Sequence, residues 1–139
     1  MKVFLLLLTC LFSLHALCAE IAVVVSVHSP VSLIRQREVS NIFLAKTSRF
    51  ANGEKTIPLE INNRSLRERF YKNITDKTPG QLQSYWTTLI FSGKGKPPKS
   101  FSNTESLLNY MHGNAGAIAY LPFSAVTKEM KVIYLIADE

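Results

Sequence analysis

The stretch W-T-T-L-I-F-S-G-K-G-K-P-P-K-S runs from Trp86 to Ser100, and G-N-A-G-A-I-A-Y follows from Gly113 to Tyr120. The first stretch leads from an apolar helical pattern through glycine into a basic loop with two prolines. The second leads from glycine into a short apolar strand pattern. Helix, loop and strand therefore alternate here, which favours an α/β protein.

The residues before this loop have the spacing of a helix that faces a core. Leu82, Tyr85, Trp86, Leu89 and Ile90 recur at i, i+3, i+4, i+7 and i+8, which is one apolar stripe of an α-helix. Tryptophan on such a stripe usually buries its ring area, so Trp86 is predicted to pack rather than to stack on a ligand. Ser92-Gly93 ends the helix, and residues 94–99 are expected to form a loop.

Strand patterns lie on both sides of this region. Residues 21–27 form a continuous β-branched run, which is typical of a strand buried on both faces. Residues 117–121 and 132–136 are predicted as closing strands. Residues 56–61 form a further strand, in which Pro58 favours an edge position. With a helix expected over residues 36–46, the pattern predicts a three-layer α/β sandwich.

Three further helices are expected to start near residues 65, 78 and 102. Each start has the capping-box pattern, in which a hydroxyl residue is followed three positions later by Glu or Gln. The pairs are Ser65 with Glu68, Thr78 with Gln81, and Ser102 with Glu105. Pro79 also suits the first turn of a helix.

The N-terminus has the layout of a secretory signal peptide. Lys2 precedes an apolar run from Val3 to Leu17, and cleavage is expected near Ala19. Residues 1–19 are therefore predicted to be removed and residues 20–139 to form one exported domain. An uncleaved membrane anchor is the alternative, but the run is shorter than the roughly 20 residues that a span needs. Both cysteines, Cys10 and Cys18, lie in this segment, so no disulfide is expected in the domain. The mature chain is predicted to be periplasmic, with no membrane span.

The chain carries a formal net charge of +6, which suits an anionic ligand or partner. Nucleic acid is not expected, because the lysines are scattered and no aromatic residues interleave a basic stripe. His28 and His112 are far apart in sequence, and no metal-ligand spacing is present. We therefore expect a protein that is not an enzyme and holds no metal or cofactor.

The best candidate for an anion site is the segment from Asn62 to Arg67. A helix start exposes backbone N–H groups and a partial positive charge, and Arg64 and Arg67 flank the hydroxyl of Ser65. Alternatively, Glu68 folds back onto the helix start and takes the place of an anion, which leaves both arginines as surface charges.

Several of these motifs together resemble the phosphate-type periplasmic substrate-binding proteins. The similar segments are N-I-F-L-A-K at 41–46, F-A-N-G at 50–53, R-S-L-R-E-R-F at 64–70 and A-I-A-Y at 117–120. The strand end V-V-S-V-H-S-P at 24–30 resembles a further family motif. The resemblance implies one lobe of a type 2 periplasmic-binding-protein fold. It also implies that the position of Ser65 contributes a phosphate ligand, with Arg64 or Arg67 supplying charge.

The sequence departs from this family at two points. The family's phosphate-binding arginine falls on Glu60, whose carboxylate would repel phosphate. The second lobe, which would close over the ligand, has no counterpart. The ends of strands and helices often meet around a ligand in α/β sheets, so His28 and Ser29 are expected to line the same side as Ser65.

The functional expectation is a non-catalytic solute-binding-like domain that holds phosphate or another small oxyanion weakly. An ABC permease, a sensor or an envelope protein is the expected partner, and a homodimer would restore a two-sided cleft. The alternative is a periplasmic protein–protein interaction module with no small ligand.

Overall fold

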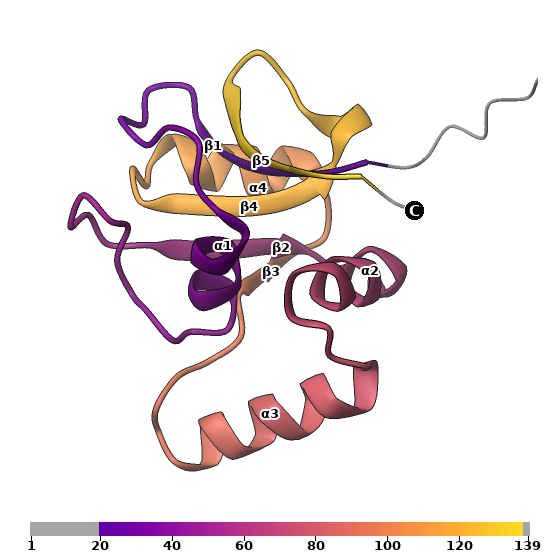
Figure 1. Cartoon of the computed structure of the whole chain (residues 1–139). Coiled ribbons are helices and arrows are strands. Elements are labelled where there is room, and N and C mark those ends of the chain that lie inside the picture. The colour runs from indigo at the N-terminus through magenta and orange to yellow at the C-terminus, as the bar shows by residue number, and fades with distance from the viewer. Residues whose placement is uncertain (1–19, 138–139) are drawn as a thin grey trace, which may run out of the picture.

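The computed structural model describes residues 20–137, so the predicted signal segment and both cysteines lie outside the described residues. This part of the chain forms one α/β unit (Figure 1). The strands are β1 (Ile21–Ser26), β2 (Ile57–Ile61), β3 (Lys99–Phe101), β4 (Ala117–Pro122) and β5 (Met130–Ile136). The helices are α1 (Gln36–Phe43), α2 (Arg64–Thr75), α3 (Pro79–Phe91) and α4 (Thr104–His112), with a 3-10 turn η1 at Phe123–Ala125.

The strands of residues 20–137 make one sheet in the order β3-β2-β4-β1-β5. β2 pairs in parallel with β3 and β4, whereas β1 runs antiparallel to both β4 and β5. The first and last strands of residues 20–137 therefore lie side by side, with Ile21 opposite Ile136. Gly116 brings β4 against the chain before β2, because a Cβ there would lie 2.1 Å from the Lys55 carbonyl oxygen.

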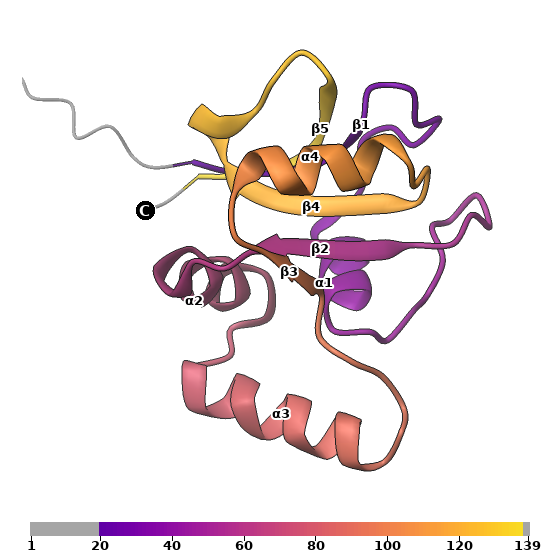
Figure 2. The ribbon, with the colours of Figure 1, turned by 180° about the vertical axis from the view of Figure 1, so that it is seen from behind.

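Helices cover both faces of this sheet, as the sequence predicted. α4 covers the face seen in Figure 2, and α1 and α2 cover the face seen in Figure 1. Alternate residues of β1 serve the two cores: Val23 and Val25 pack towards α1 and α2, and Ala22 and Val24 pack towards α4. The predicted three-layer α/β sandwich is confirmed.

Helix α3 lies outside α1 and α2, away from the sheet (Figure 1). Leu82 and Trp86 anchor it in the core, and the Tyr85 hydroxyl donates to the Leu44 carbonyl oxygen at 2.6 Å. Trp86 is only 4% exposed, so its packing role is confirmed. The prediction is wrong at the far end of the apolar stripe, because the Ile90 side chain is 54% exposed.

The predicted helix starts hold within two residues, but only one capping box is correct. Thr78 and Gln81 form the complete reciprocal box at α3. At α2 the N-cap is Asn63, whose side chain accepts from the Leu66 N–H at 3.0 Å. At α4 the N-cap is Asn103, which accepts from the Ser106 N–H. Asparagine is as good a cap as serine, and each lies where the chain leaves a strand.

Three boundaries also differ from the prediction. β2 is not an edge strand, but β3 pairs only from Leu59 onward, so Pro58 lies before that pairing begins. The residues of β3 were not predicted as a strand: residues 94–99 were expected to form a loop, and a helix was expected to start near residue 102. α1 ends at Phe43 rather than Lys46, because Ala45 adopts a left-handed conformation with φ 55°.

The two edges of the sheet differ in length. The β3 edge has only three residues, Lys-Ser-Phe. The β5 edge has seven, and the segment before α1 meets it where the Ile34 N–H donates to the Ile133 carbonyl oxygen at 3.1 Å.

Candidate functional site

A groove of about 340 Å³ lies between α2 and α3. Arg64, Arg67 and Glu68 of α2 form its charged side. Its other side is largely apolar and comprises Pro79, Leu82, Gln83, Trp86, Thr87, Ile90 and Pro97. Residues that are about one helical turn apart share a face, so α2 presents Arg64 and Arg67 together. The groove therefore unites two of the five residues predicted as ligand-binding.

Arg67 is already paired with a carboxylate inside the protein. Its Nη1 lies 3.4 Å from Oε1 of Glu60, whose side chain is 4% exposed. Glu60 lies on β2, directly before the turn that leads into α2. The residue that was expected to repel phosphate is thus the counter-charge of the arginine that was expected to bind it.

Tyr120 holds the other oxygen of the same carboxylate. Its hydroxyl donates to Glu60 Oε2 at 2.6 Å, and both side chains are buried. The Tyr120 ring stacks on Phe70 with centroids 3.7 Å apart and an angle of 7° between the planes. Phe43 packs edge-on against both rings. A well-packed aromatic cluster therefore fixes the position of the tyrosine hydroxyl.

Burial raises the pKa of Glu60, and the Tyr120 hydrogen bond and the positive charge of Arg67 oppose that shift. Burial, together with the charge of Glu60, also raises the pKa of Tyr120 and Tyr71. The tyrosine hydroxyls therefore stay protonated and act as donors at neutral pH. Glu60 is the titrating group of this cluster.

Arg64 pairs with Glu68 at the solvent surface. Its Nε lies 3.1 Å from Glu68 Oε1, and the Arg64 side chain is 91% exposed. Glu68 therefore does not fold back onto the helix start, and the predicted box with Ser65 is wrong. Such an exposed pair is worth little and leaves Arg64 available to a ligand.

Ser65 is exposed next to Arg64, but it does not line the groove. Its hydroxyl makes no hydrogen bond with the part of the chain that the structure describes. Asn63 provides the cap that the sequence assigned to Ser65.

His28 and Ser29 lie at the opposite end of the sheet. They follow β1, which runs antiparallel to β4, whereas α2 follows the carboxyl end of β2. The Ser29 hydroxyl accepts from the Val31 N–H at 3.2 Å, and its carbonyl oxygen accepts from Lys131 Nζ at 2.6 Å. His28 is exposed. The expectation that these two residues share a side with Ser65 is wrong, because β1 has the opposite direction.

No sequence pattern indicated that Gln83 and Thr87 would face the same groove as the arginines. Both lie on the polar side of α3, and only the packing of α3 against α2 brings them to the site. The buried Nε1 of Trp86 has no hydrogen-bond partner among the described residues. This orphaned donor lies in a residue of the groove wall and costs roughly 1–3 kcal/mol.

Within residues 20–137, no group of three or more metal-binding side chains is present. No helix in that range is long and apolar enough to cross a membrane.

No model of a known protein family matches the sequence, and no curated protein matches it. The fold, however, matches solved structures. One is a protein from Clostridium perfringens, named as a putative phosphate ABC transporter substrate-binding protein and solved with bound phosphate. It superposes with a TM-score of 0.62 at 14% identity, over 84% of this chain and 45% of that one.

Two further structures give the same result. An ABC-type phosphate transport receptor from Vibrio cholerae has a TM-score of 0.60 at 14% identity, over 84% of this chain and 46% of its own. A protein from Planctomyces limnophilus, described as a possible phosphate binding protein, has a TM-score of 0.57 at 14% identity, with 84% and 42% covered. The chain thus spans less than half the length of these proteins, and its fold is that of a single lobe of a periplasmic binding protein.

Proposed function

We propose that this chain is an exported, non-catalytic binding lobe that holds a small oxyanion such as phosphate weakly in the groove between α2 and α3. The observation that carries the proposal is the presence of Arg64 and Arg67 on one wall of that groove. Guanidinium groups suit tetrahedral oxyanions because they donate two parallel hydrogen bonds. The similar solved structures include a substrate-binding protein with phosphate bound, which supports the same ligand class.

Weak binding follows from the charges around the groove. Arg67 already faces Glu60, and Arg64 faces Glu68. An oxyanion has to compete with these carboxylates and, in a single lobe, remains open to solvent. A second copy of the chain or a larger partner, such as an ABC permease, would supply the missing wall.

The expected location is the periplasm, after removal of residues 1–19. N-terminal sequencing of the protein recovered from a periplasmic extract tests this. Glu20 as the first residue supports export and cleavage, whereas an intact N-terminus in the membrane fraction supports the uncleaved anchor.

A second candidate function is a protein–protein interaction module with no small ligand. The specific observation in its favour is the exposed apolar end of α3, where Ile90 is 54% and Phe91 is 94% exposed. Ile90 also lines the groove, so a partner seated there would cover the arginines. Large exposed apolar side chains that adjoin a groove are typical of interaction surfaces.

Thermal unfolding of the purified protein tests the first candidate. Phosphate and sulfate are added separately, with sodium chloride at matched ionic strength as the control. A ligand at about 100 times its Kd stabilises by roughly 2.7 kcal/mol, which raises the Tm by several degrees in a domain of this size. Arg64→Gln should reduce this rise, because it removes one guanidinium group from the groove. The variant should still fold, since Arg64 is exposed and its loss leaves no buried charge unpaired.

Ser65→Ala distinguishes the helix start from the groove. Loss of the anion effect in Ser65→Ala would place the ligand at the helix start, outside the groove. No rise beyond the chloride control in the parent protein would remove the anion site and favour the interaction module. In that case Phe91→Ser should leave the Tm unchanged but reduce self-association or partner binding, measured by sedimentation and cross-linking.

A further inference from the structure

A second and larger cavity, of about 500 Å³, lies around the loop between α3 and β3. The loop supplies Lys94 and Lys96 to its lining, and Lys99, the first residue of β3, adds a third cation. The remaining walls come from the end of α1, the start of β2 and Tyr110 of α4. Cavities of 300–1,000 Å³ are typical of small-molecule sites.

Backbone hydrogen bonds and close packing hold the loop in one position. Its first residues close α3 in a Schellman motif, in which the Lys94 N–H donates to the Leu89 carbonyl oxygen and the Gly93 N–H to that of Ile90. Gly95 then packs so closely that a Cβ would lie 2.9 Å from Leu89 Cδ2 and 3.1 Å from Ala45 Cβ. The backbone that carries the lysines is therefore held at the cavity.

The three lysines have no carboxylate partner among residues 20–137. No acidic residue lines the cavity either. Lys99 Nζ lies 4.5 Å from the centre of the Tyr110 ring, a cation–π contact that keeps the ammonium group beside the cavity. The cavity thus has a positive charge that the protein itself does not balance.

The lining also includes the hydroxyl-bearing residues Thr47, Ser48, Thr56 and Tyr110, next to apolar surface from Ile42, Ile57 and Pro58. The Thr47 hydroxyl already donates to the Arg49 carbonyl oxygen at 3.2 Å. Thr56 Oγ1 is buried and has no hydrogen-bond partner within the described part of the chain. The cavity therefore offers ammonium groups and the hydroxyls of Ser48 and Thr56 together with an apolar wall.

The geometry points to a binding site for an organic phosphate monoester, with its phosphate against the lysines and hydroxyls and its apolar or aromatic body against Ile42, Ile57 and Tyr110. Three unbalanced ammonium groups attract a doubly charged phosphate more strongly than they attract a singly charged carboxylate. The apolar wall distinguishes such a ligand from inorganic phosphate, which has nothing to place there.

This site is separate from the groove that contains Arg64 and Arg67. Among the described residues, Pro97 is the single one that lines both. The groove lies beside α2, whereas this cavity lies at the end of the sheet where β2 begins. The proposal therefore does not depend on anion binding in the groove.

Calorimetric titration with phenyl phosphate, inorganic phosphate and benzyl alcohol tests the proposal. Phenyl phosphate should bind at least tenfold more tightly than either of the other two, because only it uses both the cations and the apolar wall. Equal affinity for inorganic phosphate would overturn the proposal, since charge alone would then explain the binding. Absence of phenyl phosphate binding would overturn it as well.

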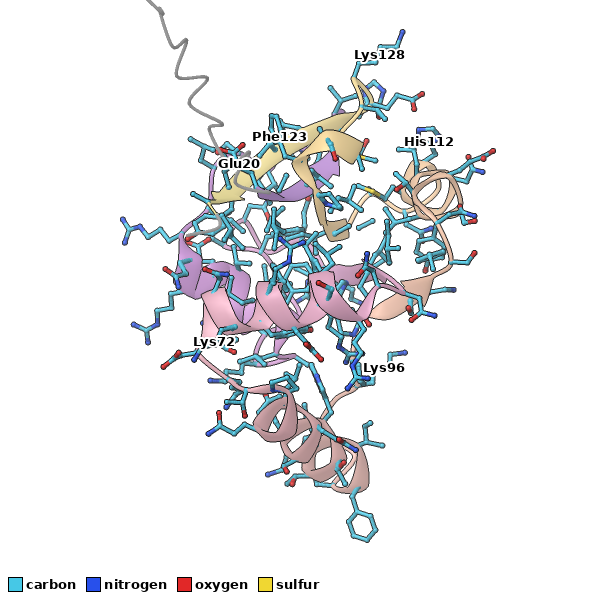
Figure 3. The ribbon with its side chains drawn as sticks, turned by 90° about the vertical axis from the view of Figure 1, so that its right-hand side faces the viewer. Glu20, Lys72, Lys96, His112, Phe123 and Lys128 are labelled. Atoms are coloured by element: carbon cyan, nitrogen blue, oxygen red, sulfur yellow. The ribbon has the colours of Figure 1, made fainter. Side chains whose placement is uncertain are left out.

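Matched charge variants locate the site. Lys94→Gln with Lys96→Gln should weaken phenyl phosphate binding at least tenfold. Lys72→Gln with Lys128→Gln removes the same charge, and Figure 3 shows both of these residues far from Lys96. An equal loss in the control pair would overturn the proposal. Amide shifts on phenyl phosphate addition should fall at Thr47, Ser48 and Thr56, and shifts confined to Arg64 and Arg67 would overturn it even if the lysine variants fail to fold.

Discussion

The hydroxyl of Tyr120 donates a 2.6 Å hydrogen bond to the buried carboxylate of Glu60, 60 positions earlier in the chain. On the other side of that carboxylate lies Arg67. Glu60 occupies the position at which the resemblance placed a phosphate-binding arginine, and it forms an internal ion pair with Arg67. Its consequences for binding and stability can be measured separately.

Glu60→Gln should strengthen oxyanion binding several-fold. The amide keeps an acceptor for Tyr120 but removes the negative charge that competes for Arg67. Sulfate is the better probe, because it keeps its double charge across the pH range in which Glu60 titrates. Parent and variant are titrated with sulfate at pH 5 and pH 7. The sulfate affinity of the parent should be lower at pH 7 than at pH 5, whereas that of Glu60→Gln should stay nearly constant. Unchanged affinity in the variant would remove Arg67 from the anion site.

Glu60 should also make stability depend on pH. Burial raises its folded pKa above the unfolded value near 4.5, so the folded state binds the proton more tightly. The stability from the protonated group is fully present below that pH and is lost as pH rises through the folded pKa. Urea unfolding from pH 4 to pH 8 should therefore show a decline in the parent relative to Glu60→Gln. A difference that does not change with pH would contradict the raised pKa.

Tyr120→Phe should destabilise the fold by about 1.5–3 kcal/mol, because it removes a hydrogen bond to a buried charged group while keeping the ring stacked on Phe70. In the Glu60→Gln background the same substitution should cost less, since a neutral amide needs the donor less. Chemical unfolding of the four proteins gives the coupling energy. Tyr85→Phe is a control that removes a hydroxyl donor from a partly buried ring elsewhere. Equal losses in both backgrounds would show that Tyr120 does not act through Glu60.

The caps of α2 give a sharp pair of variants. Asn63→Ala should cost about 1 kcal/mol, because the Leu66 N–H loses its acceptor. Ser65→Ala should change stability by a few tenths of a kcal/mol, since its hydroxyl caps nothing. Thermal unfolding without added anions compares them. The reverse order would restore the capping box that the sequence suggested.

Ala45→Gly should stabilise the protein by about 0.5–1 kcal/mol. Ala45 has φ 55°, and glycine adopts this left-handed conformation without the steric cost that a Cβ incurs. The gain is partly offset by the greater chain entropy of glycine in the unfolded state. A loss of stability in unfolding experiments would mean that the methyl group's contacts near Gly95 outweigh the backbone strain.

The sequence predicted the strands and helices well where the pattern is local. The buried run of β1 appears as expected, and the stripe on α3 is buried at Leu82 and Trp86 though not at Ile90. It missed β3, because a three-residue strand has no period to detect and forms only against β2. It wrongly placed Ser29 on the same side as Ser65, because the direction of a strand is set by its pairing in the sheet and cannot be read from a local pattern. β1 runs antiparallel to β4, so its carboxyl end lies at the other end of the sheet.

The site shows the same limit. Glu60 was recognised as an anomaly, yet its partners Arg67 and Tyr120 lie seven and sixty positions away and come together only in the fold. The lysines of the α3–β3 loop looked like ordinary solvated charges. Their arrangement around a cavity depends on Gly95 packing against Ala45, which no local pattern reveals.

The two edges of the sheet also determine how the lobe behaves beside its copies. Exposed strand edges invite other chains to pair with them, and this can lead to aggregation. Here the β3 edge has only three residues for another strand to pair with, and it carries Lys99. In the middle of β5, the Ile133 carbonyl oxygen already accepts a hydrogen bond from the Ile34 N–H. Growth of the sheet is thus disfavoured at the short β3 edge and interrupted at Ile133 on the β5 edge, so we expect a dimer of this lobe to form through side chains rather than by extending its strands.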